Sequence, residues 1–339
     1  MNITLTSDIT QRTTVYAMKK LLKRGQYVDF TNRFGQTYPL PKNHGRTAKF
    51  RRFEPLVPAI AALTEGVTPP GQKIRVSDVA VTINQYGDFT YISDWVYDTH
   101  EDPVLNQALD ILGEQVGDTV AILNIAVLKA GSSVFYAGNA ASRVTIANTI
   151  GRGDLYQIIR SLKKNKATPI TKMVKATTNI ATEPLGSSFV AMCSTDLEAD
   201  WEKVPGYKTV EFYSDSDRAL PGEHGRVGNM RVMTSGYFEP WEQAATSVST
   251  TEFLSAGVPP SAAAIPDVYP IIIVGTDSYG IVPLQGENVM QPYVVNPKAQ
   301  IGDELAQKGF AAWKGWHACI ILQQLWIKRY EVLATAKPN

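Results

Sequence analysis

Apolar residues at spacings of three and four run through residues 102–129, the clearest pattern in the chain. Such spacing turns one face of an α-helix toward a core. Its members here are Leu105, Leu109, Leu112, Val116, Val120, Leu123 and Val127. Asp102 suits the N-cap and Pro103 the first helical position. The pattern therefore predicts a helix of about 27 residues and about 40 Å, more than twice the usual length.

Two glycines, Gly113 and Gly117, lie inside this predicted helix, and Gly131 follows Lys129 where it should end. A glycine costs about 0.8–1 kcal/mol relative to alanine in a helix interior. We therefore expect a bend or a close backbone contact at the two internal positions.

Strand and turn patterns dominate the region before the helix. Residues 46–56 alternate in part, with Ala48, Phe50 and Phe53 as the apolar members. Residues 64–73 form a loop rich in glycine and proline, and alternation resumes at residue 74. The pattern predicts a strand, a long turn and a second strand. Because two strands alone are marginal in water, this hairpin should have no core of its own and should be covered by a partner.

The remaining patterns mix short helices with buried strands. Helices are predicted at residues 13–25, 153–167 and 194–207, the last capped by Ser194 or Thr195. Strands are predicted at 187–194 and 229–235, with a strand–turn–strand unit at 270–286 and a tryptophan-rich strand pair at 309–334. No repeat or Pro/Gly/Ser-rich linker divides the chain, which favours two subdomains built from discontinuous segments.

Composition is that of a globular protein, with 44% hydrophobic and 19% charged residues. The net charge is only +1, but residues 1–52 carry eleven Lys/Arg against two acids, so this segment is +9 and the remainder −8. A basic segment on an acidic body is typical of an arm that binds nucleic acid or an acidic neighbour.

The sequence shows no pattern for catalysis, a cofactor or a metal. The four histidines are scattered, without the spacing of a zinc site, and no nucleophile elbow or phosphate loop is found. Asp196, Glu198 and Asp200 alternate in a helical segment, so they should face different directions on a solvated surface. Cys193 and Cys319 should be small buried residues. We predict no catalytic, cofactor-binding or metal-binding residues.

The first twenty residues lack the pattern of a signal peptide. No uninterrupted apolar run reaches the roughly 18–20 residues that a membrane span needs. We therefore expect a soluble protein, made in a reducing compartment, with no membrane partner.

One short segment, residues 41–56, concentrates cations between aromatic residues. Its members are Lys42, Arg46, Lys49, Phe50, Arg51, Arg52 and Phe53. Exposed aromatics among cations are typical of nucleic-acid binding. In a strand, however, alternate residues could instead face an acidic protein surface while the phenylalanines are buried. The segment alone leaves both interpretations open.

The order of these parts, a basic arm, a long hairpin, one long helix and then a mixed α/β region, resembles that of tailed-bacteriophage major capsid proteins with the Hong Kong 97-type fold. The stretch LTEGVTPPGQKIRVSDVAVTINQYGDFTYISDWVYDTHEDPVLNQALDILGEQ resembles the E-loop return strand and spine helix of the family found in N-four-like podoviruses and related phages. GEHGRVGNMRVMTS, VGTDSYGIVPL and GFAAWKGWHACIIL are similar to its later blocks. The similarity spans most of residues 26–330, but residues 1–25 and 205–220 match nothing reliable.

This resemblance implies an α+β fold with the regions of a capsid subunit. They are an N-terminal arm at 1–37, an E-loop at 38–81, a peripheral domain at 82–139 with a spine helix at 102–129, an axial domain at 140–270, and C-terminal strands at 271–339 that return to the peripheral and axial domains. It also implies a non-enzymatic subunit that assembles into hexamers and pentamers of an icosahedral shell around double-stranded DNA.

The implied partners are further copies of the chain, a portal, decoration or scaffolding proteins, and packaged DNA through weak non-specific contacts. The implied location is the virion capsid, assembled in the host bacterial cytoplasm. The seven residues of the 41–56 segment become intersubunit contacts of the E-loop. Inner-surface contacts with DNA or a neighbour fall to the arm cations Arg12, Lys19, Lys20, Lys23 and Arg24.

Two other classes of function stay open. One is a DNA-binding scaffold or packaging protein that uses the basic residues 1–52. The other is an α/β enzyme whose site the sequence does not reveal.

Overall fold

The computed structural model describes residues 30–336 except 42, 44, 55, 63–64, 67, 96–103, 176–180, 214–219, 221, 250, 256–263, 285–289, 296 and 298–304. The predicted helix at 13–25, the five arm cations and Lys42 lie outside the described residues. So do the predicted cap Asp102 and Pro103.

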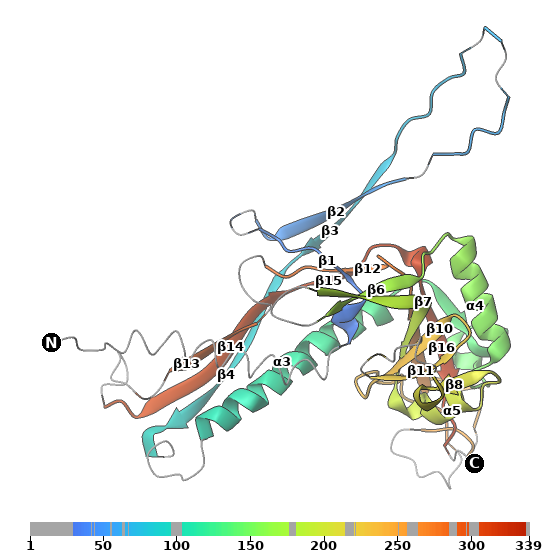
Figure 1. Cartoon of the computed structure of the whole chain (residues 1–339). Coiled ribbons are helices and arrows are strands. Elements are labelled where there is room, and N and C mark those ends of the chain that lie inside the picture. The colour runs from blue at the N-terminus through green and yellow to red at the C-terminus, as the bar shows by residue number, and fades with distance from the viewer. Residues whose placement is uncertain are drawn as a thin grey trace.

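The largest element is an eight-stranded sheet in the order β5-β16-β11-β7-β10-β9-β8, with β6 paired to β7. Its strands are β5 (Val134–Tyr136), β6 (Ile170–Lys175), β7 (Ala181–Cys193), β8 (Tyr207–Thr209), β9 (Glu223–Val227), β10 (Met230–Thr234), β11 (Val268–Val274) and β16 (Ile327–Leu333). The central strand β11 is buried along its whole length, as expected of a strand covered on both faces. This sheet organises the compact part of the molecule on the right of Figure 1.

Each face of this sheet has its own core. Helix α4 (Arg152–Lys164) and Trp201 from the short helix α5 (Glu198–Glu202) join Phe189 and Ile271 on one face. On the other face Ile272 packs with the C-terminal part of the long helix α3 (Val104–Lys129). Side chains therefore alternate between two cores along β7 and along Ile271–Val274 of β11.

Helix α3 confirms the predicted long helix. Its buried residues include Leu109, Leu112, Gly113, Val116, Gly117, Val120, Ala121, Asn124, Ile125 and Leu128. The buried face thus drifts away from the predicted Leu123 and Val127, which are only half-buried. The two internal glycines lie on this face, where the absence of a side chain allows close packing.

The C-terminal end of α3 is held by the large sheet. Arg329 of β16 donates hydrogen bonds to the backbone carbonyls of Lys129 and Gly131. A cation at this end satisfies free carbonyls and complements the helix dipole. By length and composition Gln107–Lys129 could cross a membrane, but half of an 18-residue window within it is buried inside the protein, and a core helix passes the same test.

A second sheet extends along α3, formed by β13 (Met290–Val295), β14 (Lys308–His317) and β4 (Asn84–Ser93) (Figure 1). Trp313 packs on Val116 of the helix. Its indole Nε1 donates to Gln115 Oε1 at 2.9 Å, and Gln115 in turn donates to Asp88 of β4. A polar bridge thus accompanies the apolar contact between sheet and helix.

The predicted tryptophan-rich strand pair at 309–334 is wrong. The segment forms three strands in three different sheets: β14, β15 (Cys319–Ile321), which pairs with β12 (Tyr279–Ile281), and β16. The third sheet also contains β1 (Gln36–Thr37). Local alternation predicted the strands but not their partners, since β4, which pairs with β14, lies more than a hundred residues away in the sequence.

A buried polar cluster anchors the start of the described chain, next to the 3-10 turn η1 (Thr31–Arg33). Asn124 of α3 donates to Thr31 Oγ1 and to Asn32 Oδ1, each at 2.9 Å. His317 Nε2 lies 2.8 Å from Asn124 Oδ1. Burial lowers the pKa of His317 to about 4, so the ring is neutral at pH 7.

Further 3-10 turns are η2 (Ala137–Asn139), η3 (Arg143–Thr145), η4 (Thr195–Leu197), η5 (Val210–Phe212) and η6 (Gln324–Trp326). The Ser194 hydroxyl accepts from the backbone N–H of Asp196 and caps η4, as predicted.

Candidate assembly surfaces

A two-stranded hairpin of β2 (Thr47–Phe53) and β3 (Val76–Thr82) extends far from the rest of the molecule, ending in the long loop of residues 54–75 (Figure 1). The paired strands and loop confirm the predicted hairpin. Strand β4 follows after Ile83 but pairs with β14, so the excursion ends there.

The outer part of the hairpin exposes apolar side chains. We call this set the hairpin tip: Phe53, Leu56, Val57, Ile60, Ile74 and Val76. Ile60 is 91% exposed and Phe53 65% exposed. Exposed apolar residues gathered on one projecting segment are typical of a surface that contacts another molecule.

Polar contacts between the two strands keep the hairpin extended. Arg51 Nε and Nη2 donate to the two carboxylate oxygens of Asp78 at 2.9 and 3.0 Å. These hydrogen bonds lower the pKa of Asp78 and raise that of Arg51. Further out, the Gln72 side-chain amide exchanges two hydrogen bonds with the backbone of Val57, at 3.0 and 2.9 Å. These bonds join the two sides of the loop beyond the end of β2.

The base of the hairpin has a small core, contrary to the prediction that the hairpin has none. Ala48, Ile83, Leu40 and Val282 are buried together there. Phe50 packs against this cluster, so its ring belongs to its own subunit and is not one of the exposed tip residues. The sequence pattern missed this because the partners come from residues near 40 and 282.

The other cations of the 41–56 segment have different surroundings. The Arg52 guanidinium lies over the Trp326 ring, 5.2 Å from its centroid, within its own chain. Arg46 and Lys49 are exposed. Arg51 and Arg52 make intramolecular contacts, although Arg51 is also exposed, and Arg46, Lys49 and Phe53 are exposed. The residues of this segment, Phe50, Arg51 and Arg52 included, stay predicted intersubunit contacts.

The sequence did not identify a second apolar surface, which we call the aromatic sheet face. It lies on the side of the β13-β14-β4 sheet that points away from α3 and comprises Phe89, Tyr91, Tyr293 and Phe310. Tyr91 is 67% exposed and lies edge-on to Phe89, with ring centroids 5.0 Å apart. The alternation of Phe89 and Tyr91 in β4 indicated one row of this face. The register of β4 with β14 and of β14 with β13 could not be predicted from it.

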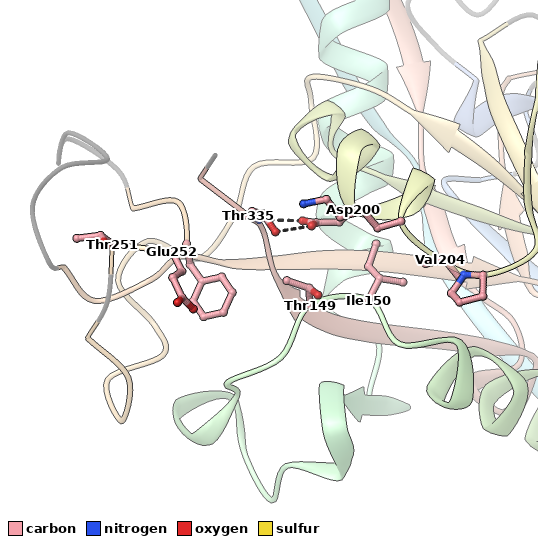
Figure 2. A pocket seen from close by; sticks show the side chains of 10 residues that line it. Thr149, Ile150, Asp200, Val204, Thr251, Glu252 and Thr335 are labelled. Carbon is pink, nitrogen blue, oxygen red and sulfur yellow. Dashed lines mark hydrogen bonds between the residues drawn. The ribbon is translucent and has the colours of Figure 1, made fainter. Parts of the chain in front are cut away.

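The hollow in Figure 2 is lined by residues that include Asp200, Glu252 and Thr335. Asp200 is buried beside it and accepts hydrogen bonds from the backbone N–H, at 2.8 Å, and the hydroxyl of Thr335. The predicted solvated surface for Asp200 is therefore wrong: the carboxylate ties α5 to the chain after β16. Within the described residues no group of three His, Cys, Asp or Glu could hold a metal.

The two cysteines also have structural environments. Cys193 is fully buried, as predicted, and accepts a hydrogen bond from Trp201 Nε1. Burial raises the pKa of its thiol to about 12, which excludes a reactive thiolate at neutral pH. Cys319 is only half-buried.

Several solved phage capsid structures have a similar fold. The capsids of Ralstonia phage GP4 and cyanophage Pam1 match with TM-scores of 0.61 and 0.57 and identities of 10% and 14%. The first alignment covers 90% of this chain and 88% of the other, and the second 92% of each. The head of Helicobacter pylori bacteriophage KHP40 matches with a TM-score of 0.61, 9% identity and coverage of 89% and 87%. The fold is thus that of phage capsid proteins, the Hong Kong 97 type.

The sequence profile of the family described as phage capsid protein matches residues 76–328. No curated protein sequence matches the chain. Because the profile covers well over half of the chain, the protein belongs to the phage capsid protein family and is a structural protein of the capsid shell.

Proposed function

We propose that copies of this chain assemble into hexamers and pentamers of an icosahedral shell that encloses double-stranded DNA, and that the hairpin joins neighbouring subunits. One observation carries the second part: the tip residues are exposed on a segment that extends beyond the core of its own subunit. The Arg51–Asp78 pair joins the two strands that carry the tip.

The aromatic sheet face is our candidate for a receiving surface. It is apolar and exposed like the tip, and burying both together removes apolar area from water at about 25 cal/mol per Å². Arg46 and Lys49 would lie at the rim of such a contact, where charges set orientation more than affinity.

The finer assignments of the subunit follow from the same proposal. Residues 1–37 would form an arm, 38–81 the E-loop, 82–139 a peripheral domain, 140–270 an axial domain, and 271–339 the returning strands. The arm cations would contact DNA or a neighbour on the inner surface. We expect no catalytic activity, assembly in the host cytoplasm, and contact with a portal and with decoration or scaffolding proteins.

The proposal is tested by a double variant, Val57→Asp with Ile60→Asp, imaged by electron microscopy beside the unaltered chain in the same buffer. A matched control, Val57→Ile with Ile60→Leu, keeps the tip apolar. We expect shells from the control and folded, unassembled subunits from the aspartate variant. Normal shells from the aspartate variant would refute a joining role for the tip, whereas no shells from the unaltered chain would refute assembly itself.

A further inference from the structure

Helix α4 lies at the edge of the compact part of the molecule (Figure 1), where it buries one side and exposes the other. Leu155, Ile158 and Leu162 on the buried side belong to the core of the large sheet. On the exposed side every side chain of the helix is a cation except that of Tyr156. We call these cations, together with the exposed lysine just after the helix, the basic face: Arg152, Arg160, Lys163, Lys164 and Lys166.

The basic face has no acid of its own. The only acid of α4 is Asp154, whose Oδ2 accepts hydrogen bonds from the Tyr330 hydroxyl at 3.0 Å and from the backbone N–H of Gly138 at 2.8 Å. Asp154 is therefore turned toward the buried Tyr330. Within the part of the chain that the structure describes, no member of the basic face forms an ion pair.

Helix stability accounts for only part of this arrangement. Lys163 and Lys164 lie in the last turn, where cations complement the helix dipole. Arg152, however, lies in the first turn, where a cation is unfavourable. Arg160 and Lys164 are four residues apart, so their like charges repel each other. An anion bound along the basic face would offset both effects.

The shape of the basic face suits an extended anion. Arg152, Tyr156, Arg160 and Lys164 follow one another at intervals of four residues and so form one stripe along the helix. At 1.5 Å per residue the stripe is about 18 Å long, which matches about five phosphates along one strand of duplex DNA. Arg152 Nη2 donates to the Tyr156 hydroxyl at 3.2 Å, and this contact keeps the guanidinium on the stripe.

The composition of the basic face favours a nucleic acid over a second protein. The centre of a protein interface is usually apolar and depleted of charged residues, above all of lysine. The basic face has three lysines, and Tyr156 is the one exposed aromatic residue of α4. Lysine and arginine clustered along one helix are typical of contacts with the phosphate backbone.

We propose that the basic face binds the phosphate backbone of duplex DNA without reading its sequence. This inference rests on the proposed function, because the DNA is the one that the shell encloses, and it assigns α4 to the inner surface. The site is additional to the arm cations. Binding of this kind releases counterions from each neutralised phosphate, so its affinity falls steeply as salt is added.

The test measures the affinity of the whole, unassembled chain for a short fluorescent DNA duplex by anisotropy, over a series of salt concentrations. One variant, Arg160→Gln with Lys164→Gln, removes two charges from the basic face. The matched control, Lys73→Gln with Arg75→Gln, removes an exposed lysine and an exposed arginine from the loop of the hairpin. A second variant, Arg160→Lys with Lys164→Arg, keeps both charges of the face.

We expect the slope of log affinity against log salt to become shallower by about 2 in the glutamine variant, since each lost phosphate contact removes about 0.9. The slope should stay unchanged in the matched control and in the variant that keeps both charges. An unchanged slope in the glutamine variant would overturn the proposal. An equal change in the matched control would overturn it too, because it would leave only general screening.

Electron microscopy of shells formed without DNA separates this inference from the proposed function. The glutamine variant should form the same shells as the unaltered chain, because the basic face does not join subunits. Loss of shells with unchanged DNA affinity would assign the basic face to an acidic surface of a neighbouring copy and overturn DNA binding. Shells from an unaltered chain that does not bind DNA would overturn this inference alone and leave assembly standing.

Discussion

The contribution of Ile60 to assembly can be worked out from its exposure. The side chain is 91% exposed in the subunit, and fully burying an isoleucine side chain contributes about 1.5–3 kcal/mol. If a neighbour covers it, Ile60→Ala removes most of that contact, or about 2 kcal/mol. Since each 1.4 kcal/mol is tenfold in an equilibrium constant, the concentration at which shells first form should rise about thirtyfold.

The assay is light scattering across a dilution series, with sedimentation to separate shells from subunits. The unfolding midpoint of the unassembled Ile60→Ala subunit should stay unchanged, because an exposed side chain contributes little to folding. An unchanged threshold of assembly would show that no neighbour covers Ile60. A large drop in the unfolding midpoint would show instead that the tip packs within its own subunit.

Three further predictions concern the subunit itself. His317→Gln should remove an acid sensitivity of folding. The pKa of His317 is about 4 in the folded protein and about 6.5 in the unfolded chain, so the wild type loses on the order of 3 kcal/mol of stability as the pH falls between these values. Urea unfolding midpoints that fall equally in both proteins from pH 7 to pH 4 would contradict this. Phe50→Ala should cost about 2–3 kcal/mol in urea unfolding and the exposed Phe53→Ala under about 0.5 kcal/mol; similar costs would mean that Phe50 has no core. Asp200→Ala should lower the free energy of unfolding by about 1–3 kcal/mol and speed the amide hydrogen exchange of Thr335. Unchanged exchange would argue against a stabilising contact between Asp200 and Thr335.

Local sequence patterns predicted elements well where one face of each element is buried. The spacing of Leu109, Leu112 and Val116 predicted α3, and the loop of glycine and proline predicted the hairpin. The buried face then drifted to Ile125 and Leu128, because the last turns of α3 pack on a different sheet from the first. The spacing of apolar residues alone does not show that one helix packs on two different sheets along its length.

Contacts between distant segments did not follow from the sequence. Phe50 packs with residues near 40 and 282, and Asp200 binds Thr335. Tyr91 lies beside Phe310 only because β4 pairs with β14. The sequence does not show whether the partner of a charge or an aromatic ring is solvent, its own chain or another subunit. For the tip residues the structure shows exposure on a projecting segment, and contact with another subunit stays a proposal.

The most direct test of hairpin-mediated assembly is an electron-microscopy reconstruction of particles formed by the purified chain. We predict closed shells in which residues 54–75 lie over an adjacent copy, with Ile60 covered. Shells in which this loop folds back on its own subunit or faces only solvent would contradict the account.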